Sequence, residues 1–340
     1  MSKVFLISSL IIGTIIGAGF ASGREIVSFF GQTPSIFVAP TVAVLTFVFV
    51  IVYLFAGKKA QATTLDEYHK TIFGKGQIFL SVVTLTNCII TMSAMLAGMD
   101  ALFSAYVPLK PLFSVIFAIF STLIVISGKK GLLNASGIIV PLLVAVTIII
   151  SSNAIDQPQI ELSISVQSMV NSVLYTALNS MLSASVIVTI GDLSTRQIII
   201  SSLISAIIMG LLTLLITLAL CSTSVAQSEM PMIEMASYNP VLLAVAIFSV
   251  ACAIFTTLIA SHSALSQWVN EFSKSRVFSA VITAIASLIL SFIGFKEIVD
   301  TLYLGLGVIG VGYAVVNAVY LFRKRSIDEE VYPRTLLRHT

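Results

Sequence analysis

The sequence reads LIIGTIIGAGFASGRE from Leu10 to Glu25, inside an apolar run long enough to cross a lipid bilayer. Four glycines interrupt this run: Gly13, Gly17, Gly19 and Gly23. Each interior glycine weakens a helix by about 0.5–1 kcal/mol relative to alanine. Because unpaired backbone amides cannot face lipid, a helix that breaks near residue 18 must open onto protein or a water-filled cavity. The stretch therefore predicts a broken membrane helix that binds a solute. The alternative is an unbroken helix that uses its GxxxG spacing for close packing.

The composition is that of a membrane protein. Hydrophobic residues make up 57% and charged residues 10% of the 340 residues, and the mean hydropathy is +1.06. Soluble proteins carry roughly 25% charged residues. The first apolar segment continues into a full span, so we interpret it as mature protein and not as a cleaved signal. Three cysteines have no spacing typical of a disulfide or metal site, and a net charge of +3 gives no nucleic-acid signal.

Apolar runs predict ten membrane spans, at about 20 residues for each crossing. Spans 1 to 10 are expected at about 4–30, 35–56, 77–105, 111–127, 132–151, 167–190, 197–220, 240–268, 277–294 and 297–322. We expect a single transmembrane domain over 1–322 and a basic cytoplasmic tail over 323–340. Of the 18 basic residues, 15 fall on the side of the N-terminus, which predicts that both termini are cytoplasmic. The expected location is the inner (plasma) membrane of a bacterial cell.

Ten spans divide into five plus five, so the second half must cross the membrane upside down relative to the first. Repeat one would cover about 4–151 and repeat two about 167–322. Secondary transporters built in this way hold substrate near the midplane with broken helices at matching positions. Span 6 has no central glycine or proline, but Asn179 and Ser180 can bond locally to the backbone. The repeat predicts a broken span 6, and the alternative is a continuous, merely polar helix.

The stretch from Gly13 to Gly23 resembles the broken first helix of amino acid–polyamine–organocation transporters, which share the LeuT fold. Its opening GTIIGAGFASGRE is similar in particular to bacterial membrane proteins of the YkvI type. The resemblance implies an all-α polytopic protein with ten transmembrane helices as a 5+5 inverted repeat and broken helices 1 and 6. It also implies that a bundle of spans 1, 2, 6 and 7 rocks against a scaffold of spans 3, 4, 8 and 9.

Span 8 carries a candidate ion site. Ala253, Thr256 and Thr257 stand at i, i+3 and i+4, on one helix face, where their oxygens suit a hard cation. In sodium-coupled relatives this pattern joins two carbonyls of span 1, which the resemblance assigns to Gly13 and Ile16. The alternative is that both threonines bond to their own helix. Span 5 lacks the lysine of some proton-coupled relatives, which favours sodium as the coupling ion, and no other cofactor is expected.

The resemblance places the substrate at the break, where amides at the start of a half-helix favour a carboxylate. The candidate substrate-binding residues are Gly17, Ala18, Gly19 and Phe20 of span 1, Asn87 and Thr91 of span 3, and Tyr175, Thr176 and Asn179 of span 6. For the two span 3 residues, hydrogen bonding between helices is an equal alternative. No ionisable side chain is expected at the centre of this pocket, and that absence favours a zwitterion such as a small amino acid.

Arg24 and Asp300 are charges inside predicted spans, where buried charges are costly and usually paired. Relatives close their outer vestibule with an Arg–Asp pair between spans 1 and 10, so these two residues form the predicted gate. A static pair and two residues that snorkel to the interface are alternatives. Glu25 is a further possible partner for Arg24.

These features predict a secondary active transporter, with sodium-coupled symport of a small amino acid or related zwitterion by alternating access. The alternative is a proton-coupled or uncoupled exporter or channel for small organic solutes. An intramembrane enzyme would need clustered acid, base or nucleophile side chains at the midplane, and the sequence shows none, so no enzymatic activity is expected. The expected partners are the solute, sodium and membrane lipids, and not nucleic acid.

Overall fold

The computed structural model describes residues 3–31, 34–104, 106–127, 132–158, 160–191 and 193–323, with the backbone alone described over 132–138. The α-helices are α1 (Lys3–Ile15), α2 (Ala18–Ala21), α3 (Arg24–Phe30), α4 (Val38–Ala60), α5 (Leu65–Phe73), α6 (Gln77–Phe103), α7 (Leu112–Ser127), α8 (Leu132–Ala154), α9 (Val166–Ile187), α10 (Thr195–Cys221), α11 (Pro231–Ala236), α12 (Pro240–Ser273), α13 (Arg276–Ser291), α14 (Phe295–Glu297) and α15 (Tyr303–Phe322). Three further helical turns are η1 (Gly74–Gly76), η2 (Val225–Gln227) and η3 (Ile298–Leu302). The predicted basic tail beyond residue 323 lies outside the described residues.

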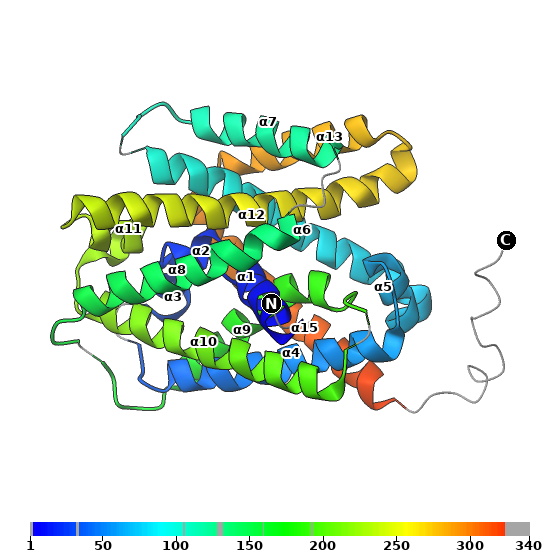
Figure 1. Ribbon diagram of the computed structural model, residues 1–340, viewed down its shortest axis with the longest axis horizontal. Coiled ribbons are helices and arrows are strands. Elements are labelled where there is room, and N and C mark those ends of the chain that lie inside the picture. Colours follow the sequence, from blue (N-terminus) through cyan, green and yellow to red (C-terminus); the bar gives the residue numbers. More distant parts are fainter. Residues whose placement is uncertain are drawn as a thin grey trace.

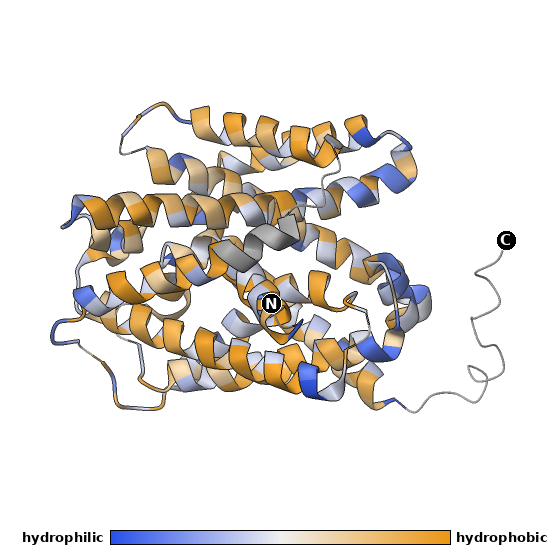
Figure 2. Ribbon diagram, viewed as in Figure 1, coloured by the Kyte–Doolittle hydropathy of each residue, from blue (hydrophilic) through white to orange (hydrophobic). Residues whose placement is uncertain are grey.

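Within the described residues, six helical segments are long and apolar enough to cross a membrane, and four shorter apolar helices accompany them. The six include α4, α9, α10 and α12, and the shorter ones include α1, α7 and α13. Figure 2 shows hydrophilic residues gathered at the two ends of the long helices, while hydrophobic residues cover the lengths between. The protein is therefore a multi-pass membrane protein. Helices occupy all ten predicted span positions, and the count of ten crossings stays a prediction.

The helices form two groups (Figure 1). In one group α4 packs on α10, α9 and α15, and α1 packs on α9 and α10. In the other, α6, α7, α12 and α13 pack on one another. The short α2 contacts α6 and α12 of the second group, and α8 contacts α1, α10 and α12. The division follows the bundle and scaffold that the sequence predicts, with the broken first span between them.

The predicted break in span 1 is confirmed. Helix α1 ends at Ile15, and Gly17 adopts an extended backbone with φ −91° and ψ −166°. The Gly17 N–H bonds to the Ile15 carbonyl at 2.9 Å, so the Gly13 carbonyl loses the partner that an unbroken helix would give it. A second interruption follows at Gly23, whose φ of +80° lies in the left-handed region that glycine tolerates.

The predicted break in span 6 is wrong. Helix α9 runs without interruption over 22 residues. The side-chain amide of Asn179 donates to the Tyr175 carbonyl at 3.0 Å, and the Ser180 hydroxyl donates to the Ala177 carbonyl at 3.2 Å. Both polar side chains thus bond to the preceding turn while the helix continues, because no glycine or proline weakens the backbone there. Span 6 is the continuous polar helix of the alternative interpretation.

Gly310 allows α15 to approach α9 closely, which gives the first testable prediction. A Cβ at this position would lie 2.6 Å from the Ala177 carbonyl oxygen, so the two backbones would have to move apart. We expect Gly310→Ala to lower the melting temperature of the purified protein, at a cost of about 1–3 kcal/mol from overpacking. Gly312→Ala, two residues along the same helix, is the matched control because nothing lies within 4 Å of its added Cβ. Equal melting temperatures for the two variants would contradict this account of the packing.

Candidate substrate and ion site

The break in span 1 lies against both helices that the sequence placed beside it. A Cβ added to Gly17 would lie 3.6 Å from the Met95 side chain and 3.8 Å from the Thr257 side chain. A Cβ added to Gly98 of α6 would lie 3.4 Å from the Cβ of Ala18. Helix α2, whose first three amides have no acceptor within the helix, is thus enclosed between α6 and α12. Every residue from Ala18 to Ala21 is buried.

Several predicted substrate-binding side chains carry buried polar atoms without a partner. Among the described residues, these atoms are Asn87 Oδ1, Thr91 Oγ1, the Tyr175 hydroxyl and Asn179 Oδ1. An unsatisfied buried polar atom costs about 1–3 kcal/mol, and native proteins keep few of them. These four are among twelve such atoms in the described residues, and a ligand bound at the predicted site would satisfy them. The Thr91 hydroxyl and Asn87 oxygen do not make the hydrogen bonds between helices that the alternative interpretation required.

Thr176 is placed in α9 as predicted, but its hydroxyl is already satisfied. It donates to the Ser172 carbonyl of its own helix at 2.7 Å. Phe20 is fully buried in α2. The unsatisfied polar atoms thus come from other positions, although the Thr176 hydroxyl, like any hydroxyl that donates in this way, keeps lone pairs for a ligand.

A cavity of about 10 Å³ lies at the predicted ion site. Its lining residues are Gly13 and Ile16 of span 1, Ala253 and Thr256 of α12, and Ile139, Val140 and Leu143 of α8. Such a volume holds about one water-sized sphere. Four of the five predicted ion ligands thus border one small space, while the three α8 residues contribute apolar walls that the sequence did not indicate.

The two threonines of the ion site differ. The Thr256 hydroxyl donates to the Ala253 carbonyl at 3.0 Å, as the alternative interpretation expected. A hydroxyl that donates its proton in this way still has lone pairs for a cation. Thr257 Oγ1 is buried and, among the described residues, has no hydrogen-bond partner. Bonding to their own helix therefore accounts for Thr256 alone.

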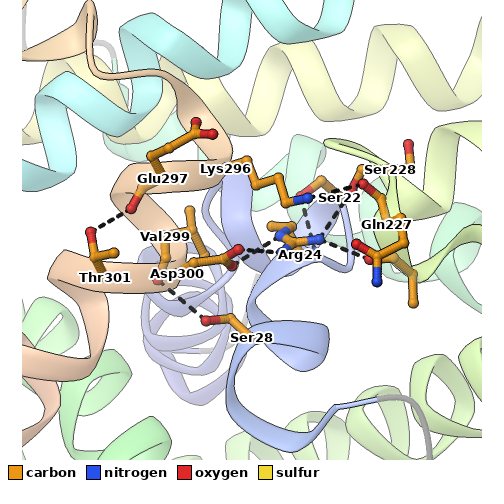
Figure 3. Close-up of polar contacts among 11 residues, drawn as sticks. Ser22, Arg24, Ser28, Gln227, Ser228, Lys296, Glu297, Val299, Asp300 and Thr301 are labelled. Carbon is orange, nitrogen blue, oxygen red and sulfur yellow. Dashed lines mark hydrogen bonds and ion pairs between the residues drawn. The ribbon is translucent and has the colours of Figure 1, made fainter.

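Arg24 and Asp300 form an ion pair (Figure 3). Arg24 Nε donates to one carboxylate oxygen of Asp300 at 3.0 Å, and Nη2 donates to the other oxygen. The side chain of Arg24 is 6% exposed and that of Asp300 29% exposed. Two parallel bonds from a planar guanidinium make this the strong, directional form of a salt bridge. Asp300 lies in η3, so the pair joins span 1 to span 10, and its role as a gate stays a prediction.

The same arginine also holds a loop in place, which the sequence analysis did not anticipate. Arg24 Nη1 donates to the carbonyls of Ala226 at 2.8 Å and Ser228 at 3.3 Å, in the loop between α10 and α11. Nearby, the Met232 N–H donates to the Ser22 carbonyl at 2.8 Å. The segment 225–236, which we call the lid loop, therefore rests on the second interruption of span 1. Main-chain acceptors leave no trace in residue types, so no sequence signal could have found them.

Glu25, which the sequence left open as a further partner for Arg24, lies in a different environment. It is not the partner of Arg24; its carboxylate accepts a hydrogen bond from the Asn179 side-chain amide at 3.3 Å. The residue is 2% exposed, and its carboxylate lies against Gly19, where an added Cβ would come within 2.2 Å of Oε1. The expectation of a pocket without ionisable side chains is therefore wrong. An acidic residue inside an apolar span was the available signal, because charges buried in membranes are usually functional.

No protein-family model matches the chain. A search of solved structures finds MhsT in complex with L-phenylalanine, which matches with a TM-score of 0.68 over 94% of this chain and 95% of that one, at 12% identity. The protein has the LeuT fold. A Na⁺-coupled sialic acid symporter of this fold matches with a TM-score of 0.67 and 12% identity, over 95% of this chain and 80% of that one. The LeuT-fold neighbours are transporters rather than enzymes.

Among curated proteins, the uncharacterised membrane protein YkvI of Bacillus subtilis (strain 168) is 26% identical over 317 residues, which cover 86% of this chain and 88% of YkvI. The resemblance that the sequence analysis drew from the opening motif, to the LeuT fold and to YkvI, is confirmed. At these identities the solved structures establish the fold alone.

Proposed function

We propose that this LeuT-fold protein is a secondary active transporter that carries a small amino-acid-like solute together with sodium ions, by alternating access. The observation that carries the proposal is the set of buried, unsatisfied polar atoms on four of the predicted substrate-binding residues. They come from α6 and α9, which belong to the two different helix groups. A solute bound between two groups can be released to either side when the groups move relative to each other.

Sodium coupling is supported by the small cavity beside Ile16. Gly13, Ile16, Ala253 and Thr256 line it, and the proposed ligands are the main-chain carbonyls of the first three and the Thr256 hydroxyl. Oxygen ligands suit hard cations, and Thr257 adds an unsatisfied hydroxyl on the same helix face. Because these carbonyls belong to the turn that ends α1, an ion bound there would fix the geometry of the break and so of the solute site.

Closure is proposed at the Arg24 end. The distribution of basic residues favours this as the outer side, with both termini cytoplasmic. Here the ion pair with Asp300 and the lid loop cover α2 and α3 (Figure 3). In the proposed cycle these contacts form after the solute has entered from outside and break when the outer side opens again.

A thermal-shift screen of the purified protein tests the proposal. Amino acids are added at millimolar concentration in buffers that contain either sodium or potassium at the same ionic strength. We expect at least one amino acid to raise the melting temperature in sodium and to do so much less in potassium, because only a ligand that binds the folded state stabilises it. In reconstituted vesicles the same solute should accumulate against its gradient when sodium is high outside. Equal shifts in both salts and flux without accumulation would contradict the proposal.

A further inference from the structure

We infer that Glu25 pairs with a positively charged nitrogen of the solute, so that the site selects compounds with an ammonium group and does not require their carboxylate. The inference rests on the proposed function, since it places the solute at the break in span 1. It goes beyond that proposal because it names the group that is recognised and the side chain that recognises it.

The first argument is the isolation of the carboxylate. Glu25 is 2% exposed, and in the part of the chain that the structure describes no lysine, arginine or histidine lies within ion-pair distance of it. Among the described residues, its one hydrogen bond comes from the neutral amide of Asn179. An uncompensated buried carboxylate costs several kcal/mol, more than one neutral hydrogen bond offsets. Either a bound proton or a cation that enters the pocket would remove this penalty, and only the cation leaves the carboxylate ionised.

The neighbouring arginine cannot supply that charge. Arg24 Nε and Nη2 donate to Asp300, and Nη1 donates to the carbonyls of Ala226 and Ser228. All three guanidinium nitrogens of Arg24 thus donate to acceptors other than Glu25. Glu25 follows directly after Arg24 in α3, and successive helical side chains point about 100° apart, which separates the two charges.

The second argument is the kind of atom left unsatisfied. Asn179 Oδ1 is an amide oxygen, which only accepts hydrogen bonds, and it is buried without a donor among the described residues. An ammonium group carries three donors and no acceptor. A carboxylate carries acceptors alone, so it would not satisfy this oxygen and would be repelled by an ionised Glu25. The pocket beside α9 is therefore complementary to a cation.

The third argument is the aromatic surround. Tyr175 and Tyr303 are fully buried and lie near Glu25. The ring of Tyr175 meets those of Phe29 and Phe30 edge to face, with centroids 5.5 and 5.3 Å apart. Aromatic rings attract cations through the negative potential of their faces. The walls thus favour an organic ammonium group with apolar substituents over a hydrated inorganic cation.

The test compares matched compounds that differ in whether they carry an ammonium group, a carboxylate group or both. Alanine, leucine and phenylalanine are each measured beside the amine that lacks the carboxylate (ethylamine, isopentylamine, phenethylamine) and the acid that lacks the amine (propanoate, 4-methylpentanoate, 3-phenylpropanoate). Melting-temperature shifts and dissociation constants are recorded in sodium. We expect at least one amino acid and its amine to bind and the matching acid not to bind.

The variant Glu25→Gln keeps the size of the side chain and one acceptor oxygen, and it removes the negative charge. We expect it to fold with an unchanged elution profile and to bind the ammonium compounds at least about tenfold more weakly, as loss of a charged hydrogen bond predicts. Glu297→Gln removes an exposed acid at the start of span 10 and is the matched control, with no change expected.

Two results would overturn the inference while the proposed function stands: binding of an acid as tight as that of its amino acid, or equal binding of the ammonium compounds to Glu25→Gln and to the unmodified protein. Sodium-dependent binding in those cases would still indicate a transporter. If no ammonium compound of the panel shifted the melting temperature, the inference would be wrong as well. The absence of any sodium-dependent amino acid response would remove the proposed function itself.

Discussion

Replacement of Arg24 by alanine is expected to open the site from the outer side and to abolish retention of bound solute. The change removes both bonds to Asp300 and both bonds to the lid loop, so two closing contacts are lost together. A charged hydrogen bond contributes about 1.5–3 kcal/mol, and the partial exposure of Asp300 puts the loss at the lower end of that range. Solute dissociation should therefore become about tenfold faster or more.

Thiol labelling measures this opening directly. Ala21, a buried residue of α2, is replaced by cysteine in a background without Cys88, Cys221 and Cys252, and a membrane-impermeant maleimide is added from outside. We expect labelling to be several-fold faster when Arg24 is alanine. Asp300→Asn should have a smaller effect, because it leaves the bonds from the arginine to the lid loop in place.

A second ion pair at this end of the molecule provides the control for the gate. Lys110 and Glu229 lie 3.5 Å apart with side chains 57% and 40% exposed. Exposed ion pairs contribute little to stability. The cysteine introduced at position 21 should therefore be labelled in Lys110→Ala at the rate of the parent protein. Slow labelling and normal retention in Arg24→Ala would show that the pair with Asp300 is a static contact and would remove the gate from the mechanism.

The second large effect is expected at the ion site. Thr256→Val and Thr257→Val each replace a hydroxyl by a methyl group of similar size, and the double variant removes two of the five proposed sodium ligands. We expect each single variant to need about tenfold more sodium for half-maximal solute binding, and the double variant to lose sodium dependence. Solute binding is measured as a function of sodium at constant ionic strength.

Thr283→Val is the matched control for this series. Thr283 is a buried threonine of α13 whose hydroxyl donates to its own helix, as that of Thr256 does. A general effect of removing a buried hydroxyl should appear in all three single variants, whereas a sodium site affects only those in α12. Unchanged sodium sensitivity in the double variant would show that the ion binds elsewhere or that no ion is coupled.

The elements that the sequence predicted well depend on local chemistry. Glycine spacing predicted the break at Gly17, because backbone weakness is a property of the residues themselves. The break in span 6 was predicted from repeat symmetry, from the resemblance and from the polar residues Asn179 and Ser180. It is absent, since both side chains bond back to their own helix without interrupting it. Repeat symmetry predicts the position in span 6 that corresponds to the break in span 1, but the residues present there decide whether the helix breaks.

The candidate site could be predicted in part for a similar reason. Helical periodicity placed Thr256 beside Ala253, and the structure shows both at the same cavity. The environment of Glu25 could not be predicted, because its contact with Asn179 depends on how α3 packs on α9. Arg24 and Glu25 are successive residues of α3 whose side chains point about 100° apart, so one pairs with Asp300 and the other with Asn179. Neighbouring charges in sequence are therefore a poor guide to pairing.

The way Arg24 holds the lid loop has an evolutionary consequence. The arginine binds main-chain carbonyls of Ala226 and Ser228, so almost any residue type at those two positions would preserve the contact. Homologous proteins should therefore vary in the residue types of this loop while they retain its length and backbone conformation. A single inserted residue would do more damage to closure there than several substitutions.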